Sequence, residues 1–533
     1  MTAIPSLTSS AVTTSMPTTA WRLGHMLDDY AEAQPGSTAL IVGGDRYHIT
    51  YATLAELIVD QYEVLLRRGL QPGDVVALKA SNSIEFVVAL LAAARANLVV
   101  APIDPALPWA ERRARADRVG ARVILTDAQP TDPPQEGAPE WRLQITPSAA
   151  PHAKPAMRLV ATDSARTVTA PLSGLTDRDA LIMFTSGTTG MPKLVPWTHE
   201  NLAASIEGIV DGYQLDSSDA TVAAMPLFHG HGLVATLLAT LATGGAVVLP
   251  AAGRFSAHTF WDDFATADAS WYTAVPTIHQ ILLDRAAAEF PCGYRGRLRF
   301  VRSCSAPLAS ATVERMESTF KAPVLAAYGM TETTHQASSV LPSAGTSTRM
   351  HTVGAPTGLS VRIVDDNGAT CPPGVSGEIW LRGPTVVRGY LDNADATATT
   401  FVDGWVRSGD IGSVDGHGDL TIQGRIKELI NRGGEKISPE HVEQVLMSHR
   451  GVNQAAVFAV PDALYGERVA AAIVPHNGFH LQESELVSYC THRLAKFEIP
   501  ERITFVDKLP LTAKGSVDRT KLATTSCPGL SVK

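Results

Sequence analysis

The sequence predicts an α/β protein, with a large multi-subdomain α/β body at its amino end and a small α+β domain at its carboxyl end. The chain has 533 residues, too many for one ordinary core, and 45% of them are hydrophobic, enough for two or more cores. Helical and strand-like segments alternate along most of its length, for example at residues 85–96 and 98–102. These observations favour two unequal domains.

The large body is expected to span residues 21–424. Its alternating pattern is interrupted at residues 128–175, where Pro, Ala, Ser and Thr accumulate, and we interpret this stretch as a surface excursion. Residues 429–533 differ, since a capped helix at 438–448 is followed by two strands. That order predicts a small, separate α+β domain.

Charge, hydropathy and cysteine content argue against several classes of protein. A net charge of −9 offers no basic face for nucleic acid, and no apolar stretch reaches the roughly 20 residues of a membrane span, so we expect neither partner. The five cysteines lack paired spacing, which favours a reducing, cytoplasmic location over a disulfide framework. Residues 1–20 have no secretion signal and are expected to be a disordered lead-in. The oligomeric state is not indicated.

A loop rich in glycine and hydroxyl groups follows the predicted strand at residues 180–184. Glycines let the backbone approach phosphate oxygens, hydroxyls donate hydrogen bonds, and a lysine adds positive charge. A plain turn is the alternative for any glycine-rich loop, but the full string is more specific, and it has the spacing of neither a P-loop nor a dinucleotide fingerprint. The candidate phosphate-binding residues are Thr185, Ser186, Gly187, Thr188, Thr189, Gly190 and Lys193.

This string resembles the phosphate loop of the adenylate-forming superfamily, which contains acyl-CoA synthetases, luciferases and peptide-synthetase adenylation domains. Four more motifs recur in that family's order, at residues 327–332, 376–378, 408–410 and 424–428. The resemblance covers about residues 21–519. It implies a ligase that uses ATP and Mg²⁺, forms an acyl adenylate, and releases AMP and pyrophosphate.

The later motifs carry groups suited to a nucleotide. Tyr328 offers a flat ring for adenine, Thr331 a phosphate donor, and Glu332 a hard oxygen ligand for magnesium. Asp410 can accept both ribose hydroxyls, and Arg425 can donate to ribose or phosphate. A surface carboxylate, a turn aspartate and a surface arginine are the alternatives for Glu332, Asp410 and Arg425. The resemblance adds Gly329 and Met330, and it places Ser305, Ala306 and Pro307 beside the adenine.

The resemblance also implies a hinge at residues 425–428, with Lys427 at its centre, about which the small domain rotates. Gly433 and Gly434 resemble the place where the pantetheine arm of CoA passes. A plain turn before the helix capped by Ser438 explains the same glycines. CoA is the default acceptor.

Within this superfamily the chain is most similar to the oxalate:CoA ligase branch. The similarity lies in residues 225–232, 251–256, 271–280, 302–305 and 333–335. It implies a short, very polar acid held by His231, Ser303 and His335, with His229 as the histidine that closes over it. Each of these histidines taken alone also fits a satisfied core residue.

One motif departs from the family pattern. The family carries Pro-x-Thr-x-Ser-Gly-Lys, whose lysine bridges the acid and the α-phosphate, whereas this chain has Ser516 in the lysine's place and Lys514 in the serine's. We favour Lys514 as the replacement, since residues two apart point to the same side of an extended segment. Two alternatives are a small or reactive acid that needs no lysine, such as nitrite in a diazotase-like ligase, and a non-adenylating relative.

The sequence therefore predicts an AMP-forming ligase that joins a small polar acid to an acceptor, by default CoA. Transfer to an amine and nucleotide binding without catalysis are the competing hypotheses. The expected catalytic residues are Thr185, Lys193, His229, Thr331, Glu332 and Lys514.

Overall fold

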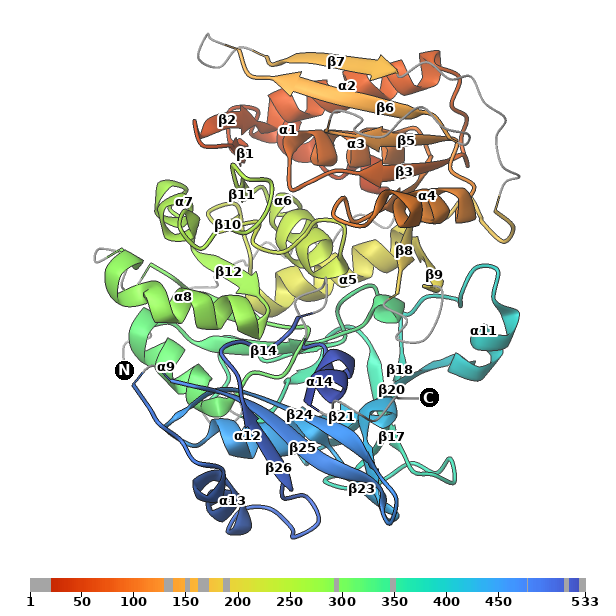
Figure 1. The fold of residues 1–533 in the computed structure, drawn as a ribbon. Coiled ribbons are helices and arrows are strands. Elements are labelled where there is room, and N and C mark those ends of the chain that lie inside the picture. Colours follow the sequence, from red (N-terminus) through yellow and green to blue (C-terminus); the bar gives the residue numbers. More distant parts are fainter. Residues whose placement is uncertain are drawn as a thin grey trace, which may run out of the picture.

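The computed structural model describes residues 21–128, 138–148, 154–161, 172–185, 192–291, 297–345, 351–476, 478–511 and 517–526. Within these ranges the strands form five sheets with helices packed around them (Figure 1). The first four sheets belong to the large amino-terminal part and the fifth to the small carboxyl-terminal part. The predicted α/β class, with a large body and a small α+β domain, is confirmed.

The largest sheet has seven strands in the order β7-β6-β5-β3-β4-β8-β9. Its centre is parallel, and α3 packs on it with nearly every side chain buried, which explains why that helix reads as a continuous apolar run. The strands are β3 Val75–Lys79, β4 Val99–Pro102, β5 Val123–Thr126, β6 Glu140–Thr146, β7 Ala156–Ala161, β8 Asp179–Phe184 and β9 Leu194–Thr198. The nearby helices are η1 Leu23–His25, α1 Asp28–Ala33, α2 Tyr51–Arg67, α3 Ile84–Arg95 and α4 Trp109–Arg118.

The expectation of a surface excursion at residues 128–175 is wrong for part of that stretch. Strands β6 and β7 lie within it and extend the sheet at one edge, β6 pairing parallel with β5 and antiparallel with β7. Leu143 and Ile145 of β6 are buried, and they alternate with exposed polar residues. This half-buried edge strand is short, and the residues around it are rich in Pro, Ala and Thr. The alternation of apolar and polar residues was therefore not recognised in the sequence.

Two further sheets complete the middle of the body. Strands β12, β13 and β14 run parallel, so their carboxyl ends meet at one edge of their sheet. One sheet contains β1 Thr38–Val42, β2 Tyr47–Thr50, β10 Ala220–Val222 and β11 Ala246–Leu249, and the other β12 Trp271–Ala274, β13 Phe300–Ser303, β14 Val324–Tyr328, β15 Ser338–Ser339 and β16 Ala355–Pro356. The associated helices are α5 His199–Tyr213, η2 His231–Leu238, α6 Ala239–Leu241, α7 Phe260–Thr266, α8 Pro276–Glu289, α9 Ser310–Phe320 and η4 Thr331–Thr333.

A fourth sheet precedes the small domain and is antiparallel. Its last strand, β21, pairs with β20 and places Arg425 opposite Asp410. It contains β17 Ser360–Val364, β18 Gly377–Arg382, β19 Phe401–Val402, β20 Trp405–Val414 and β21 Leu420–Arg425, with α11 Ala394–Thr400 beside it and η5 Ile426–Glu428 after it.

The carboxyl-terminal domain, blue in Figure 1, has its own sheet and its own core. The predicted helix at 438–448 is confirmed as α12, and Ser438 caps it by accepting the His441 N–H at 3.2 Å. The elements are β22 Ile430–Arg432, β23 Glu435–Ile437, α12 Pro439–Met447, β24 Val452–Asp462, β25 Gly466–Pro475, α13 Glu483–Thr491, β26 Arg502–Phe505 and α14 Arg519–Ser526. The boundaries at residues 425–428 stay a prediction, and residues 1–20 lie outside the described ranges.

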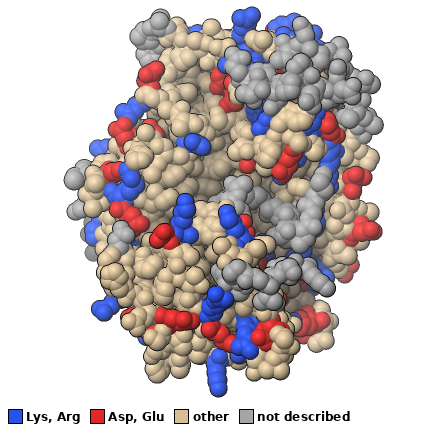
Figure 2. All heavy atoms as spheres, in the orientation of Figure 1, with Lys and Arg blue, Asp and Glu red and all other residues tan. Residues whose placement is uncertain are grey.

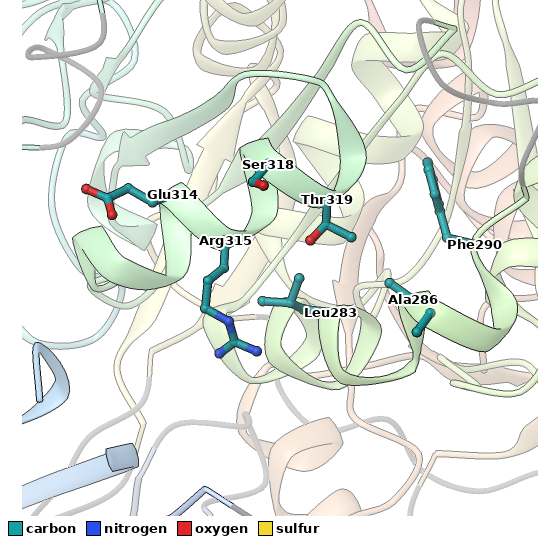
Figure 3. Close-up of a pocket in the computed structure, with 8 residues that line it drawn as sticks. Leu283, Ala286, Phe290, Glu314, Arg315, Ser318 and Thr319 are labelled. Atoms are coloured by element: carbon teal, nitrogen blue, oxygen red, sulfur yellow. The ribbon is translucent and has the colours of Figure 1, made fainter. Parts of the chain in front are cut away.

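Two features of the described surface are the charge pattern of one face and a groove between two helices. Acidic and basic side chains are interspersed on the face shown in Figure 2. A groove of about 480 Å³ between α8 and α9, lined by residues such as Leu283, Phe290 and Arg315, contains none of the predicted site residues (Figure 3). Among the described residues, no helix combines the length and the apolar character needed to cross a bilayer.

His199, the first residue of α5, ties the amino end of the described chain to the body. Its ring Nδ1 accepts the Leu23 N–H at 3.1 Å, and burial, assisted by Arg22, lowers the pKa of His199 to about 4. Since this value is below the ordinary 6.5, neutral His199 contributes stability that is fully present above pH 6.5 and is lost as pH falls toward 4. We expect His199→Gln to lower the free energy of unfolding by about 1–3 kcal/mol at pH 7, and by less at pH 4.5.

Urea unfolding of both proteins at pH 7 and at pH 4.5 measures this difference. Other histidines titrate equally in the two proteins, so their contributions cancel. A difference that does not change with pH would contradict the expectation.

Candidate functional site

The base of the predicted phosphate loop is closed by hydrogen bonds between its two ends. Thr185, which follows β8, donates its N–H to the carbonyl oxygen of Lys193 at 3.1 Å, and its Oγ1 accepts the Lys193 N–H at 3.1 Å. The body thus holds the entry and the exit of the loop together. The intervening candidates Ser186, Gly187, Thr188, Thr189 and Gly190 lie outside the described residues.

A cation and a carboxylate meet beside this loop. The Lys193 Nζ lies 4.2 Å from the centre of the Tyr390 ring, and the Tyr390 hydroxyl donates to Glu332 Oε1 at 2.7 Å. Burial lowers the pKa of Lys193, Glu332 opposes that shift, and Lys427 adds to it. Charges from the loop, from η4 and from the predicted hinge therefore act on one another at this point.

Tyr390 was missed by the sequence interpretation. It follows Gly389 and lies in none of the recognised motifs, and a single aromatic residue after a glycine has no spacing that separates it from a core residue. Burial, followed by the neighbouring Glu332, raises the pKa of Tyr390 far above its usual range. Its hydroxyl therefore stays protonated and keeps donating to the carboxylate.

The segment that carries Thr331 and Glu332 is fixed by its neighbours. The Trp197 Nε1–H donates to the carbonyl oxygen of Thr331 at 2.8 Å, and Trp197 is fully buried. Gly329 packs so closely that a Cβ there would lie 1.5 Å from the carbonyl oxygen of His335. Only glycine fits this position, because the backbone on either side of the turn is already in contact.

The predicted nucleoside residues form one hydrogen-bonded group. The Tyr328 hydroxyl donates to Asp410 Oδ2 at 2.6 Å, and the Arg425 Nε–H donates to Asp410 Oδ1 at 2.7 Å. Burial, and then Asp410, raises the pKa of Tyr328 well above its usual range, so the phenol remains a donor. A carboxylate has about four acceptor positions, so Asp410 retains capacity for ribose hydroxyls.

Glu378 supports this group from β18, in a motif to which the sequence interpretation gave no role. Its Oε1 accepts the N–H of Gly409 at 3.3 Å, and its Oε2 accepts from Trp380 Nε1 at 2.9 Å and from Arg407 Nε at 3.0 Å. These contacts fix the backbone just before Asp410.

Two of the three predicted acid-pocket residues lie in direct contact. The rings of His231 and His335 stack with their centroids 5.3 Å apart and their planes 19° apart. His231 Nε2 lies 2.6 Å from Thr273 Oγ1, and His231 Nδ1 lies 3.1 Å from Ser305 Oγ. Ser305, which with Ala306 and Pro307 is expected beside the adenine, is thus also in contact with a residue predicted to bind the acid.

Ser303 ends β13, in register with Ala274 of β12 and Ala326 of β14. Its Oγ is buried and has no hydrogen-bond partner among the described residues. A buried hydroxyl without a partner costs roughly 1–3 kcal/mol. A ligand oxygen that accepted from Ser303 would recover this free energy.

Both histidines are neutral at pH 7. Burial, together with nearby positive charge that includes Arg302, holds the pKa values of His231 and His335 well below the ordinary range. The permanent positive charge here is that of Arg302, which is fully buried directly before Ser303. Arg302 belongs to the segment 302–305 that resembles the oxalate:CoA ligase branch, but the sequence analysis assigned it no role.

The backbone at His335 is strained. Thr334 has φ of 50° and His335 has φ of 79°, both in the left-handed region that residues with a Cβ rarely adopt. The Ser205 hydroxyl donates to the Thr334 carbonyl oxygen at 2.6 Å, and the Thr334 hydroxyl donates to that of Thr385 at 2.8 Å. The surrounding structure therefore imposes the position of the His335 ring, as is common at functional sites.

The remaining candidates are placed as follows. The His229 ring lies against that of Phe228 just before η2, with centroids 4.6 Å apart and planes tilted by 55°. Gly433 and Gly434 have φ of 61° and 100° and form the turn between β22 and β23. A tight turn is enough to require these glycines, so their contact with CoA stays a prediction. Lys514 lies outside the described residues.

Two family models match the chain. The model of the AMP-binding enzyme covers residues 27–391, and the model of the AMP-binding enzyme C-terminal domain covers residues 441–516. The chain belongs to the AMP-binding enzyme family. An oxalate–CoA ligase of Arabidopsis thaliana is 43% identical to this AMP-binding enzyme over 501 residues, which cover 93% of this chain and 97% of that protein. A sulfoacetate–CoA ligase of Cupriavidus necator is 35% identical over 456 residues, which cover 85% of this chain and 88% of that protein.

Solved structures of similar proteins support this family assignment. The structure of ATP-bound MatB from Rhodopseudomonas palustris has a TM-score of 0.81 at 29% identity and covers 95% of this chain and 98% of that one. The o-succinylbenzoate CoA synthetase of Bacillus subtilis, in complex with ATP and magnesium ion, has a TM-score of 0.76 at 27% identity and covers 93% and 99%. The predicted class is confirmed: this AMP-binding enzyme is an ATP-dependent, AMP-forming acid ligase of the acyl-CoA synthetase type.

The described residues fit magnesium bound together with a nucleotide. Glu332 is a buried carboxylate, 7% exposed, and magnesium commonly binds through one or two carboxylates and the phosphates of its substrate. No group of three His, Cys, Asp or Glu side chains in the described ranges could hold a metal ion by itself. If Glu332 binds magnesium as predicted, the phosphates of ATP would have to supply further ligands.

Proposed function

We propose that this AMP-binding enzyme joins a short acid with a second anionic end to CoA, and that oxalate is its substrate. The observation that carries this proposal is a cluster of buried polar side chains near the ends of β12 and β13. It contains two stacked neutral histidines, a buried arginine, and a buried serine hydroxyl that has no hydrogen-bond partner in the part of the chain that the structure describes. A fatty-acid ligase needs an apolar tunnel instead. Two of the relatives are named as ligases of oxalate and sulfoacetate, both of them short acids with two anionic ends.

The first step forms an acyl adenylate. A carboxylate oxygen of the acid attacks the α-phosphorus of ATP, the bond to the bridging oxygen breaks, and pyrophosphate leaves with that electron pair. Lys193 and the Thr185 hydroxyl would stabilise negative charge on the phosphates, while Tyr328, Asp410 and Arg425 hold the nucleoside. Magnesium, bound by Glu332 and the phosphates, would supply positive charge to the leaving pyrophosphate.

The second step forms the thioester. The sulfur of CoA attacks the acyl carbon, and AMP leaves with the electron pair of the acyl–oxygen bond. Rotation about residues 425–428 would bring Gly433 and Gly434 to the pantetheine arm. We propose that the enzyme works in the cytoplasm, a reducing compartment in which Cys304, Cys371 and Cys490 stay free thiols.

A substrate panel tests the proposal. Purified protein with ATP and magnesium is incubated with oxalate, glyoxylate, malonate, sulfoacetate, acetate or nitrite, each with and without CoA, and pyrophosphate release and the acyl product are measured. We expect oxalate with CoA to give the fastest release, together with oxalyl-CoA detected by mass spectrometry. Fastest release with nitrite, or release that does not depend on CoA and is stimulated by an added amine, would instead indicate a diazotase-like or amide-forming enzyme. No release with any acid despite ATP binding would indicate a non-catalytic relative.

A further inference from the structure

Arg302 is a fully buried cation that contacts neutral groups. Its Nε donates to the Tyr213 hydroxyl at 3.1 Å and its Nη1 to Thr273 Oγ1 at 3.2 Å. Its Nη2 donates to His335 Nε2 at 3.2 Å and to Gln336 Oε1 at 2.8 Å. Among the described residues, no carboxylate pairs with it. A buried charge without a counter-ion is costly, so the body holds this guanidinium in place at the expense of stability.

Arg302 decides which nitrogen of His335 carries the proton. A guanidinium has five N–H donors and no acceptor. The His335 Nε2 that faces it must therefore offer a lone pair, and the proton of the neutral ring lies on Nδ1. His335 is thereby fixed as an Nδ1–H donor.

Through Thr273, Arg302 also determines which nitrogen of His231 carries the proton. Its Oγ1, fully buried on β12, accepts from Arg302 and lies 2.6 Å from His231 Nε2. A threonine hydroxyl has one proton to donate, and within this group of side chains its acceptor is His231 Nε2. His231 then carries its own proton on Nδ1, the nitrogen next to Ser305 Oγ at 3.1 Å. The two stacked rings are thus donors through the same ring position.

We propose that Arg302 is a positioning residue for the acid: it fixes His231 and His335 as neutral Nδ1–H donors and supplies the positive field that the second anionic end of the substrate requires. This inference rests on the proposed function for the identity of the substrate. Arg302 itself acts through His335 and Thr273. Acids that lack a second anionic end gain nothing from this arrangement, so Arg302 determines specificity for diacids.

The first test needs no substrate. Protein labelled with ¹⁵N-histidine is studied by NMR, in which protonated and unprotonated ring nitrogens have distinct chemical shifts, and the two rings are assigned with His231→Asn and His335→Asn. In the native protein we expect both rings to be protonated at Nδ1 alone. Thr273→Val removes the hydroxyl but keeps the shape, so we expect His231 alone to lose its preference for protonation at Nδ1. Arg302→Met is expected to remove this preference from both rings. Protonation of His335 at Nε2 in the native protein would overturn the inference.

The second test is kinetic and uses Arg302→Met, Arg302→Lys and Thr273→Val. For Arg302→Met we expect KM for oxalate to rise at least 10-fold, a loss of about 1.4 kcal/mol in binding, with KM for ATP unchanged. The ratio of kcat/KM for oxalate to that for glyoxylate is expected to fall by about the same factor. Arg302→Lys keeps the charge and is expected to recover part of this ratio. Tyr213→Phe is the matched control, since it removes the acceptor of the Arg302 Nε–H and keeps the Thr273 and His335 side chains that Arg302 contacts, and we expect the ratio to stay within about threefold.

The outcomes separate this inference from the proposed function. If native protein releases no pyrophosphate with oxalate, the proposed function fails, while the NMR test of the two rings still stands. If native protein uses oxalate and all three variants keep its selectivity over glyoxylate, Arg302 has no positioning role. Should Arg302→Met fold poorly, Thr273→Val alone decides, because it retains the buried arginine.

Discussion

Replacing Glu332 with glutamine is expected to lower kcat/KM for ATP by about 10²- to 10³-fold, the size of effect seen when one group that stabilises a developing charge is removed. Glutamine has the shape of glutamate and can still accept the Tyr390 hydrogen bond, now 2.7 Å long, so the fold should not change. What is lost is the negative charge that faces Lys193 and would bind magnesium. Exchange of labelled pyrophosphate into ATP, with oxalate present, measures the effect on adenylation.

Tyr390→Phe provides the control for this experiment. It leaves the Glu332 charge in place and removes only the hydroxyl that donates to it, so we expect a loss of less than about 10-fold. Raising the magnesium concentration is expected to recover part of the activity of Glu332→Gln and none of that of Tyr390→Phe. If Glu332→Gln keeps exchange within threefold of the native rate, Glu332 is not a ligand of the reacting nucleotide's metal.

The candidate residues that the sequence predicts lie in contiguous motifs, and the structure brings several of these motifs together. Tyr328, Gly329, Thr331 and Glu332 form one turn after β14, and their close packing demands particular residue types at consecutive positions. Asp410 and Arg425 are 15 residues apart, yet each lies in a recognisable motif, and the hairpin of β20 and β21 places them opposite each other. Such local constraints leave a pattern in the sequence that can be recognised without knowledge of the fold.

The parts that were missed depend on contacts between distant segments. Arg302 contacts Tyr213, Thr273 and the adjacent residues His335 and Gln336, which come from three other stretches of chain, and the residues next to it in the sequence do not indicate that it is buried. Tyr390 is linked to Glu332 across 58 residues. Strand β6 was overlooked for a related reason: its pairing with β5 and its packing against α3 are what make its short alternation meaningful. Burial of single residues follows from topology, and local patterns do not encode it.

Removing the Lys514 side chain by Lys514→Ala is expected to slow adenylation by about 10²- to 10³-fold, because this chain has Ser516 where the family carries its catalytic lysine. Although Lys514 lies outside the described residues, the chain on both sides of it is anchored. Leu511 pairs with Val517, and Arg519 donates to Glu428 at 3.0 Å and to Glu443 at 2.8 Å. Arg519, which follows this segment, is therefore attached to the predicted hinge through Glu428, and we expect rotation about the hinge to bring Lys514 to the nucleotide.

Lys427 is the competing source of this cation, since its charge already acts on Lys193. Pyrophosphate exchange, which reports adenylation alone, is compared for Lys514→Ala, Lys427→Ala and the double variant Lys514→Ala with Ser516→Lys. We expect Lys514→Ala to lose exchange, Lys427→Ala to keep most of it, and the double variant to recover activity, because it restores the family's arrangement of serine-sized residue, glycine and lysine. A large loss in Lys427→Ala with normal exchange in Lys514→Ala would assign the role to Lys427. Normal exchange in both would mean that an acid as small as oxalate is adenylated without a bridging lysine, the α-phosphate being neutralised by Lys193 and magnesium alone.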